Sequence, residues 1–339
     1  MTRTIAKVAF LFIAYFLSSE FSYSQDFQFS QFYNVPLYQN PAFAGSLHTG
    51  RVSMHQRLQW PKLDARYTTS VISADKYFSQ YKSGVGMLIM QDYQGGHNLS
   101  STQVQVMYSY EMLINKQLTF RPGLQLGYVS EYVDYSNLRF PHQYNNYGMQ
   151  TGPDLDGLKN RKGFADVSAG GILYSRGMWV GFTANHLNTP NQSFAGGVSK
   201  LPAKFSLTSG YKIVLYKEVS LTEEGKEISV TPTFHYKSQG TSDQLDLGLY
   251  GAYNDALVGL WYRGIPIKRY ANQYANNESF IVFAGWKGES FRVGYSYDFI
   301  ISKLATVRTG GAHELNLTYI FRPHQKKKKI LKRLPCPSF

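Results

Sequence analysis

The segment Thr102–Met112, with the sequence TQVQVMYSYEM, alternates between two kinds of side chain. One face carries mainly apolar and aromatic residues: Thr102, Val104, Val106, Tyr108, Tyr110 and Met112. The other face carries polar residues, with Met107 as the exception: Gln103, Gln105, Ser109 and Glu111. Because successive residues of a β-strand point to opposite faces, this pattern predicts a long strand with one apolar and one polar face.

The same alternation recurs along the chain and predicts fourteen strands. Their expected ranges are 51–60, 67–78, 83–92, 101–113, 118–135, 164–174, 178–187, 203–213, 228–236, 243–250, 256–263, 279–287, 290–302 and 312–321. Several reach ten or more residues, whereas strands of soluble proteins usually have about five or six. Pro122 and Pro232 fall inside two of the predicted strands, where proline is unfavourable.

Long strands with one apolar face fit a transmembrane barrel better than a soluble sandwich or propeller. The polar faces carry charged residues, as the wet or hydrogen-bonded interior of a barrel would: Arg121, Glu131, Arg292, Asp298 and Glu314. The 27 Tyr and 22 Phe fit the aromatic girdles of such barrels. The sequence argues against a helical membrane protein, because no apolar run after the N-terminus reaches about 20 residues. We therefore predict an all-β fold, a transmembrane antiparallel β-barrel of outer-membrane type with about 14 strands.

The connections between the predicted strands sort by length. The long ones follow odd-numbered strands and are expected outside the cell: 93–100, 136–163, 188–202, 264–278 and 303–311. Most of the others have roughly two to five residues, as expected of periplasmic turns. The exception is 214–227, which we expect to be an enlarged periplasmic turn or an extended hairpin.

The N-terminus has the features of a secretory signal peptide, assigned to residues 1–24. Arg3 and Lys7 precede the ten-residue apolar stretch Val8–Leu17, and small residues follow, so we expect cleavage before Gln25. Ten residues are too few for a membrane anchor helix. Export also argues against a nucleic-acid partner, although the net charge is +13.

The charge is concentrated in the last residues, 322–339, where seven positive charges lie between positions 322 and 333. We expect this stretch to be a solvated basic periplasmic tail, or a segment that docks on a periplasmic partner or on anionic phospholipid. The lone Cys336 excludes a disulfide scaffold.

Residues 25–50 form a separate N-terminal segment, expected at the periplasmic mouth or in the lumen. Pro36 and Pro41 are expected to block a helix and to make the preceding residues extended. Ala42, Ala44 and Gly45 are small enough for close backbone packing. Such a segment could shut the pore, or it could be an ordinary ordered leader.

This segment also carries a family resemblance, in QDFQFSQFY at 25–33 and PLYQNPAFAG at 36–45. It resembles the opening of the PorP/SprF family, outer-membrane components of the type IX secretion and gliding apparatus. Other similar stretches are 166–170, 185–190, 259–263, 292–298 and 310–314. The family motif residues are Gln31, Pro36, Asn40, Pro41, Ala42, Ala44, Gly45, Asn185, His186, Leu187 and Pro190. The basic tail departs from the family pattern.

The resemblance implies an outer-membrane barrel of a Gram-negative-type bacterium that exports or anchors a cell-surface protein such as an adhesin. Expected partners are that secreted protein, other secretion components in the periplasm and outer-membrane lipid. Aromatic residues of the long loops are candidate contacts for the partner: Phe140, Tyr144, Tyr147 and Tyr270.

Two other functions stay open. The chain could be an outer-membrane channel or porin for small solutes, in which lumen residues set selectivity. A hydrolase with His186 as its base is the third reading, but no serine-containing nucleophile elbow or HExxH motif accompanies that histidine. We expect no enzymatic activity, no catalytic or metal-ligating residues and no cofactor.

Overall fold

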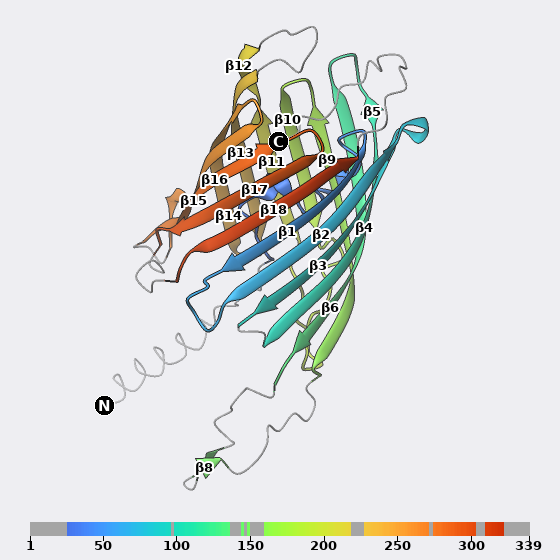
Figure 1. Ribbon diagram of the computed structural model, residues 1–339. Coiled ribbons are helices and arrows are strands. Elements are labelled where there is room, and N and C mark those ends of the chain that lie inside the picture. Colours follow the sequence, from blue (N-terminus) through green and yellow to red (C-terminus); the bar gives the residue numbers. More distant parts are fainter. Residues whose placement is uncertain are drawn as a thin grey trace, which may run out of the picture.

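A computed structural model describes residues 26–95, 98–135, 144–145, 148–149, 159–217, 227–270, 274–302 and 309–321. Fourteen strands form the wall of a closed antiparallel barrel, seen from the side in Figure 1. They are β1 (Gly50–Gln59), β2 (Tyr67–Phe78), β3 (Ser83–Gln94), β4 (Leu99–Tyr110), β6 (Thr119–Val133), β9 (Arg161–Tyr174), β10 (Met178–Asn185), β11 (Lys204–Tyr211), β13 (Glu227–Gln239), β14 (Ser242–Tyr253), β15 (Ala256–Tyr270), β16 (Tyr274–Lys287), β17 (Phe291–Ile300) and β18 (Ala312–Phe321). The predicted fold class is therefore confirmed.

Neighbouring strands in the sequence pair with each other around the whole wall, and the first and last strands close it. In the β1–β18 pair Gly50 lies opposite Phe321 and Gln59 lies opposite Ala312. Both ends of the wall therefore meet at one end of the barrel, which we call the short-turn end. The opposite end, where β1 finishes and β18 starts, carries the connections 134–160, 186–203 and 301–311 and is called the long-loop end.

Three further short pairings lie beyond the wall. The strands are β5 (Met112–Leu113), which pairs with β6, β7 (Tyr144–Asn145) with β8 (Gly148–Met149), and β12 (Ile213–Lys217) with β13. The pairing of β12 with β13 makes the predicted enlarged turn at 214–227 an extended hairpin. The η3 turn (Ser79–Tyr81) joins β2 to β3.

One predicted loop is wrong. The range 264–278 was expected to be a long connection, but β15 continues to Tyr270 and β16 starts at Tyr274, so most of the range is a strand hairpin. A register shift between Ile265 and Arg269 leaves a bulge in it. Pro122 and Pro232 do lie inside strands, opposite Gly171 and Leu249 respectively.

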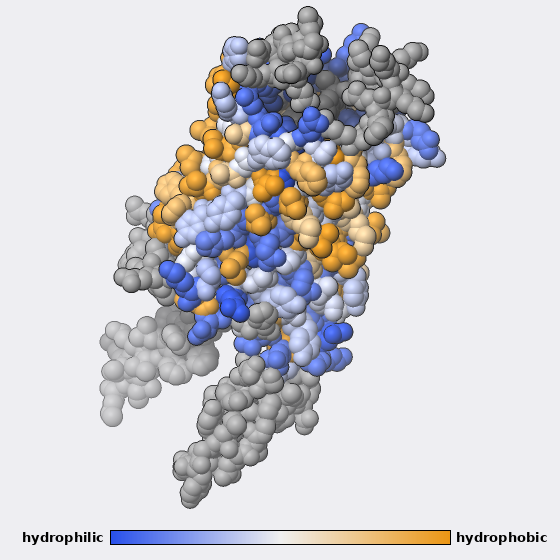
Figure 2. Space-filling view, viewed as in Figure 1, coloured by the Kyte–Doolittle hydropathy of each residue, from blue (hydrophilic) through white to orange (hydrophobic). Residues whose placement is uncertain are grey.

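The two faces of the wall separate as the alternation predicts. In β4 the side chains of Val106 and Tyr108 are about half exposed on the outside, whereas those of Ser109 and Met107 are buried inside. Figure 2 shows the apolar side chains gathered in a belt across the visible face of the wall, with a mostly hydrophilic surface between this belt and the long-loop end. Hydrogen bonds between exposed polar side chains, such as Ser70 to Gln56 and Thr102 to Gln91, lie on that hydrophilic part. No described helix is long and apolar enough to cross a membrane.

Residues 26–49 lie inside the barrel and are called the lumenal segment. The segment contains three short helices: η1 (Phe32–Asn34), α2 (Pro36–Gln39) and η2 (Pro41–Phe43). The expectation that the prolines block a helix is wrong, because each is the first residue of a helical turn, where its missing N–H has no helical partner to lose. Asn40, before Pro41, is extended with φ −159° and ψ 125°, as the proline rule predicts.

Candidate functional site: the lumenal segment and its docking surface

Asn40 of the NPAFAG motif fixes the centre of the lumenal segment. Its side-chain oxygen accepts a hydrogen bond from Ala42 N at 2.9 Å and so caps η2. Its amide nitrogen donates to the carbonyl oxygens of Gly171 at 3.2 Å and Phe182 at 2.9 Å, which belong to the adjacent strands β9 and β10. Asn40 is fully buried, so one side chain both shapes the segment and attaches it to the wall.

The small residues of the motif touch the wall at positions occupied by glycine. A Cβ atom on Gly84 would lie 2.0 Å from the carbonyl oxygen of Ala44, and one on Gly123 would lie 2.4 Å from Ala42 N. Both distances are far inside van der Waals contact. The segment backbone therefore lies directly against the wall, and a larger residue at either glycine would displace it.

Hydrogen bonds complete this attachment at the short-turn end. The carbonyl oxygen of Ala44 accepts from Ser109 Oγ at 2.7 Å and from Arg121 Nη2 at 2.9 Å. Gly45 N donates to Asp75 Oδ2 at 2.8 Å. Because Ser109, Arg121 and Asp75 all point into the lumen, the polar face of the wall receives the backbone of the motif.

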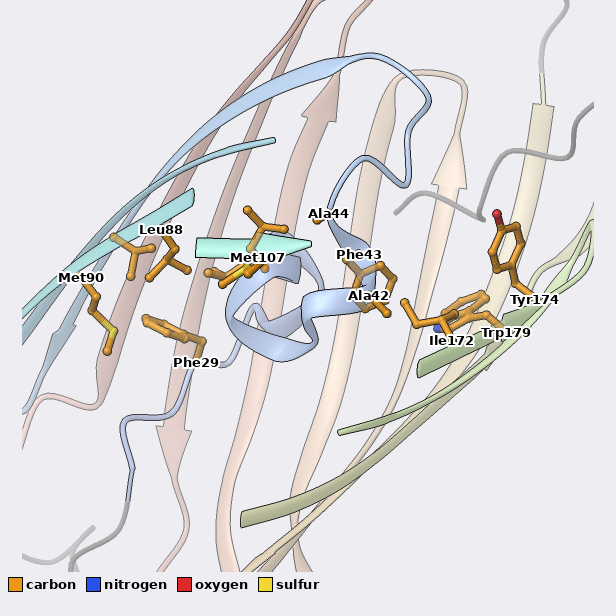
Figure 3. Close-up of a cluster of buried hydrophobic side chains, with 13 residues drawn as sticks. Phe29, Ala42, Phe43, Ala44, Leu88, Met90, Met107, Ile172, Tyr174 and Trp179 are labelled. Atoms are coloured by element: carbon orange, nitrogen blue, oxygen red, sulfur yellow. The ribbon is translucent and has the colours of Figure 1, made fainter. Parts of the chain in front are cut away.

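Apolar contacts fill the lumen around the helices (Figure 3). One cluster joins segment residues to inward-facing wall residues: Phe29, Val35, Leu37, Ala42, Phe43 and Ala44 with Val71, Leu88, Met90, Met107, Ile172, Tyr174 and Trp179. A second cluster contains Phe32 and Tyr33, with Tyr33 stacked on Trp261 at a ring-centroid distance of 4.9 Å. The core of this protein is therefore the interface between the lumenal segment and the barrel wall.

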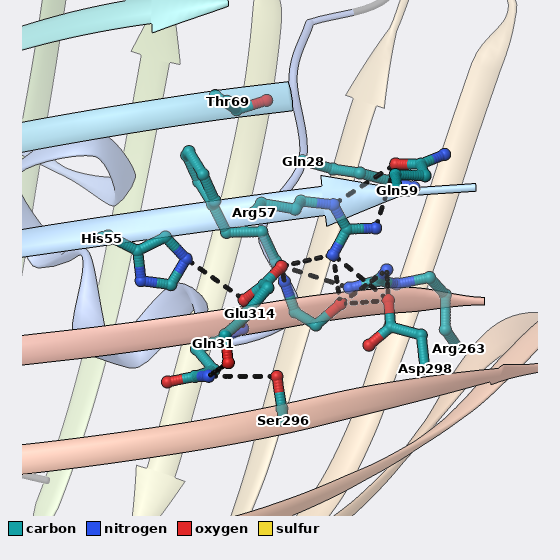
Figure 4. Close-up of polar contacts among 12 residues, drawn as sticks. Gln28, Gln31, His55, Arg57, Gln59, Thr69, Arg263, Ser296, Asp298 and Glu314 are labelled. Carbon is teal, nitrogen blue, oxygen red and sulfur yellow. Dashed lines mark hydrogen bonds and ion pairs between the residues drawn. The ribbon is translucent and has the colours of Figure 1, made fainter. Parts of the chain in front are cut away.

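An ionic network lies beside these clusters (Figure 4). The Glu314 carboxylate accepts from the backbone N–H of Ser30 at 2.6 Å and of Gln31 at 2.8 Å. Arg57 contacts Glu314 and lies 3.2 Å from Asp298, and Ser30 Oγ donates to Asp298 at 2.5 Å. Buried charges are tolerated when they are paired and hydrogen-bonded, and here the segment supplies several of those hydrogen bonds.

Gln31 and Arg263 extend the network across the lumen. The Gln31 amide donates to Ser296 Oγ at 3.1 Å and to the Glu314 carbonyl at 3.0 Å. Arg263 donates through Nε to Asp246 at 2.8 Å and through Nη2 to the carbonyl oxygen of Phe29 at 3.3 Å. Strands β15, β17 and β18 thus all hold the same few residues of the segment, and Asp246 on β14 holds Arg263 in place.

At the long-loop end the start of the segment is held by a second ionic cluster, which we call the Asp26 latch. His186 contacts Asp26 through Nε2 and Asp166 through Nδ1, each at 2.8 Å. Lys204 Nζ also contacts Asp26, and Gln239 donates to its Oδ1 at 2.9 Å. The segment therefore runs through the barrel from the long-loop end at Asp26 to the short-turn end.

The electrostatics of the latch favour its charged form. Burial alone would raise the pKa of the Asp26 carboxyl, but Lys204 and His186 outweigh it and hold this pKa well below its usual range. Burial likewise opposes charging of His186, but attraction to Asp26 and hydrogen bonds to Asp166 and Asp26 raise its pKa to about 9. At neutral pH the latch is an imidazolium and an ammonium around the segment's carboxylate.

The predicted motif residues separate into those that hold the segment and those that do not. The segment residues Gln31, Pro36, Asn40, Pro41, Ala42, Ala44 and Gly45 all lie in the lumen, and His186 reaches them through Asp26. Asn185 donates to Ser168 Oγ at 3.3 Å on the wall. Leu187 is 47% exposed, and Pro190 accepts from Leu201 N at 2.9 Å within the loop. The structure therefore brings two distant motifs together.

The predicted partner-binding aromatics cannot be placed in the same way. Phe140 and Tyr147 lie outside the described residues. Only the backbone of Tyr144 and Tyr270 is described, in β7 and β15. Their role stays a prediction.

Sequence reasoning missed most of the docking surface on the wall. Trp179, Trp261, Leu88, Met90 and Met107 are buried apolar residues on the inward face. The available signal was the break in alternation at Met107, because an apolar residue on a polar barrel face needs something apolar to cover it. Among the described residues no group of three or more His, Cys, Asp or Glu is placed to hold a metal ion.

A closed antiparallel barrel with an apolar outer belt and a packed interior defines an outer-membrane β-barrel protein. Residues 21–319, most of the chain, match the family model of the type IX secretion system membrane protein PorP/SprF, so the chain belongs to this family. The resemblance seen in the NPAFAG segment is thereby confirmed, and with it the outer-membrane location.

No curated protein matches the sequence. Among solved structures, Omp33 of Acinetobacter baumannii is 8% identical with a TM-score of 0.44, covering 82% of this chain and 100% of its own. The KdgM porin is 9% identical with a TM-score of 0.34, covering 80% and 99%. BamA of Haemophilus ducreyi lacking POTRA domains 1–3 is 8% identical with a TM-score of 0.39, covering 81% and 70%.

Proposed function

We propose that this chain is a non-catalytic, closed barrel that holds a secreted cell-surface protein, such as an adhesin, at the outer face of the outer membrane. The observation that carries the proposal is the lumenal segment. Its two apolar clusters and two ionic clusters occupy the interior that a channel would need for solutes. A barrel with such an interior acts through its rim, by binding.

The long-loop end is the side that faces the partner in this proposal. Barrels of outer-membrane type keep short turns in the periplasm and long loops outside. The hydrophilic wall between the apolar belt and the long-loop end extends the barrel beyond the lipid on that side (Figure 2). The short-turn end then faces the periplasm and the other components of the secretion machinery.

Two described residues at the long-loop end are candidate contacts. Ile267, in the bulge of the β15–β16 hairpin, is 95% exposed, and Val198, in the connection after β10, is 80% exposed. A branched apolar side chain that is exposed to water near the rim of the barrel is a candidate anchor for a partner surface. The proposal uses Ile267 and Val198 as the candidate contacts, because the structure describes their side chains and does not describe those of the predicted loop aromatics.

The channel alternative makes a different prediction for the same protein. A porin would need a continuous aqueous path past the lumenal segment. Asn40, Gln31 and Arg263, which lie between the segment and the wall, are fully buried and have no contact with such a path. The hydrolase alternative has less support, because both ring nitrogens of His186 are engaged by carboxylates in the latch.

The test is purification of the tagged barrel from native membranes in mild detergent, followed by identification of co-purifying surface proteins. The variant Ile267→Glu should lose the partner, whereas Leu215→Glu, a similar change on β12 at the short-turn end, should keep it. Purified barrel in planar bilayers should show no steady conductance. A barrel that purifies alone and conducts ions would overturn the proposal in favour of the channel.

A further inference from the structure

A small pocket lies at the short-turn end between the lumenal segment and the wall. It encloses about 440 Å³ of empty space, its open mouth included. The segment contributes Tyr33, Asn34, Pro36, Phe43, Ser46 and Leu47, and the wall contributes Arg51, Ser53, Arg292 and Thr318. The pocket therefore lies at the interface between the lumenal segment and the barrel wall.

The pairing register explains why two arginines face this pocket. Arg292 on β17 lies directly opposite Thr318 on β18, and Thr318 lies opposite Ser53 on β1. Arg51 is two residues from Ser53 and therefore points to the same inward face. The two guanidinium groups therefore line the same pocket from β1 and β17, the strands on either side of β18.

The lining of the pocket contains cationic and neutral polar groups but no anionic group. It consists of two guanidinium groups, the hydroxyls of Ser46, Ser53 and Thr318, the phenol of Tyr33 and the amide of Asn34, and none of these lining residues is a carboxylate. Arg51 donates through Nε to Asp75 at 2.7 Å, while its Nη2 is buried and has no hydrogen-bond partner. An unused guanidinium donor beside a second guanidinium forms a cradle for a negatively charged oxygen group.

The two ionic clusters described above contain a carboxylate at their centre. At the long-loop end His186 and Lys204 close on the carboxylate of Asp26, which the segment itself supplies. In the ionic network around Ser30, Arg57 pairs with Glu314, which lies opposite it on β18. The pocket differs because none of its lining residues is a carboxylate; Asp75, the partner of Arg51, lies outside the lining.

We propose that this pocket binds a small oxyanion, a phosphate ion or a free carboxylate, between Arg51 and Arg292. The bound anion would join the segment to β1 and β17 at the short-turn end, as the Asp26 latch joins it to the wall at the other end. This inference does not depend on the partner proposed above, because Arg51 lies at the opposite end of the barrel from the proposed partner contacts.

The experiment measures thermal unfolding of purified barrel in detergent, titrated with sodium phosphate, with sodium acetate and with sodium chloride at matched ionic strength. A saturable rise in unfolding temperature with phosphate or acetate but not chloride is expected, and the stronger of the two identifies the oxyanion. Arg292→Gln should weaken the apparent affinity about tenfold or more, because each charge-assisted hydrogen bond contributes at least about 1.5 kcal/mol.

Lys76→Gln is the matched control, since Lys76 is an exposed cation of the same end on the outer face, and it should bind as the wild type does. If Arg292→Gln does not fold to a heat-modifiable barrel, Arg51→Gln serves as the second variant. Equal shifts with chloride, or shifts unchanged in both arginine variants, would overturn the proposal.

Discussion

Substitution of Asn40 tests how much its side chain stabilises the docked state of the lumenal segment. Asn40→Ala removes the cap on η2 and both donations to the wall carbonyls of Gly171 and Phe182. An N-cap contributes about 1 kcal/mol, and each neutral hydrogen bond a similar amount. The docked state of the lumenal segment should therefore lose about 3 kcal/mol, which raises the population of undocked barrels about 100-fold.

Asn40→Asp is the sharper variant. The aspartate keeps an oxygen that can cap η2, but it places a second oxygen against the two carbonyls that the amide now serves. A buried carboxylate facing carbonyl oxygens is unfavourable, so this variant should be worse than alanine at pH 8. Protonation restores one donor, so the defect should diminish at pH 5.

Three assays report on docking: bilayer conductance, cleavage of the segment by added protease, and the temperature at which the barrel loses its heat-modifiable migration. Asn115→Ala is the control, because Asn115 caps two backbone N–H groups at 2.8 Å in an exposed turn away from the lumen. If Asn40→Asp behaved as wild type at pH 8, the amide donation to the wall would carry no energy and the docking account would be wrong.

The remaining predictions concern other parts of the segment. Gly84→Ala should open or destabilise the barrel because its Cβ would overlap the Ala44 carbonyl, whereas Gly251→Ala should be silent, since the nearest atoms there are 3.9 Å away; conductance and unfolding temperature test both. The contribution of His186 to docking should be complete below about pH 6.5 and lost as the pH rises through 9, because its pKa is raised; protease sensitivity of the segment from pH 6 to 10 tests this, and a flat profile contradicts it. An epitope placed directly before Asp26 should bind antibody on intact cells, and labelling only after permeabilisation would show that the long-loop end faces the periplasm.

The strands were predictable because lipid imposes the pattern. An outward side chain in the membrane must be apolar, so alternation marks each wall strand wherever it crosses the bilayer. Beyond the bilayer this constraint disappears, and so does the signal. The outer part of the β15–β16 hairpin, around Asn276 and Asn277, has polar residues on both sides of the pattern and was mistaken for a loop.

The lumenal site was predictable only in part. The NPAFAG motif identified the segment, and its small residues predicted close packing, but its path could not be deduced. Ser30 and Gln31 both donate to Glu314, which is 284 and 283 positions away from them in the sequence. Periodicity within a strand contains no information on which strand a lumenal residue will meet, so the ionic network becomes visible only once the barrel is closed.

The way the segment is held also decides how its function can be tested. Two of the wall cations have partners of their own, because Arg57 pairs with Glu314 and Arg263 with Asp246 without the segment. The apolar wall residues have no such substitute, and removing the segment would leave Trp179, Met107 and their neighbours facing water in the lumen. Complete deletion would therefore measure loss of the core as well as opening of the pore. Single substitutions at Asn40 or Gly84 weaken docking while the apolar clusters remain, so they distinguish a shut barrel from a badly folded one.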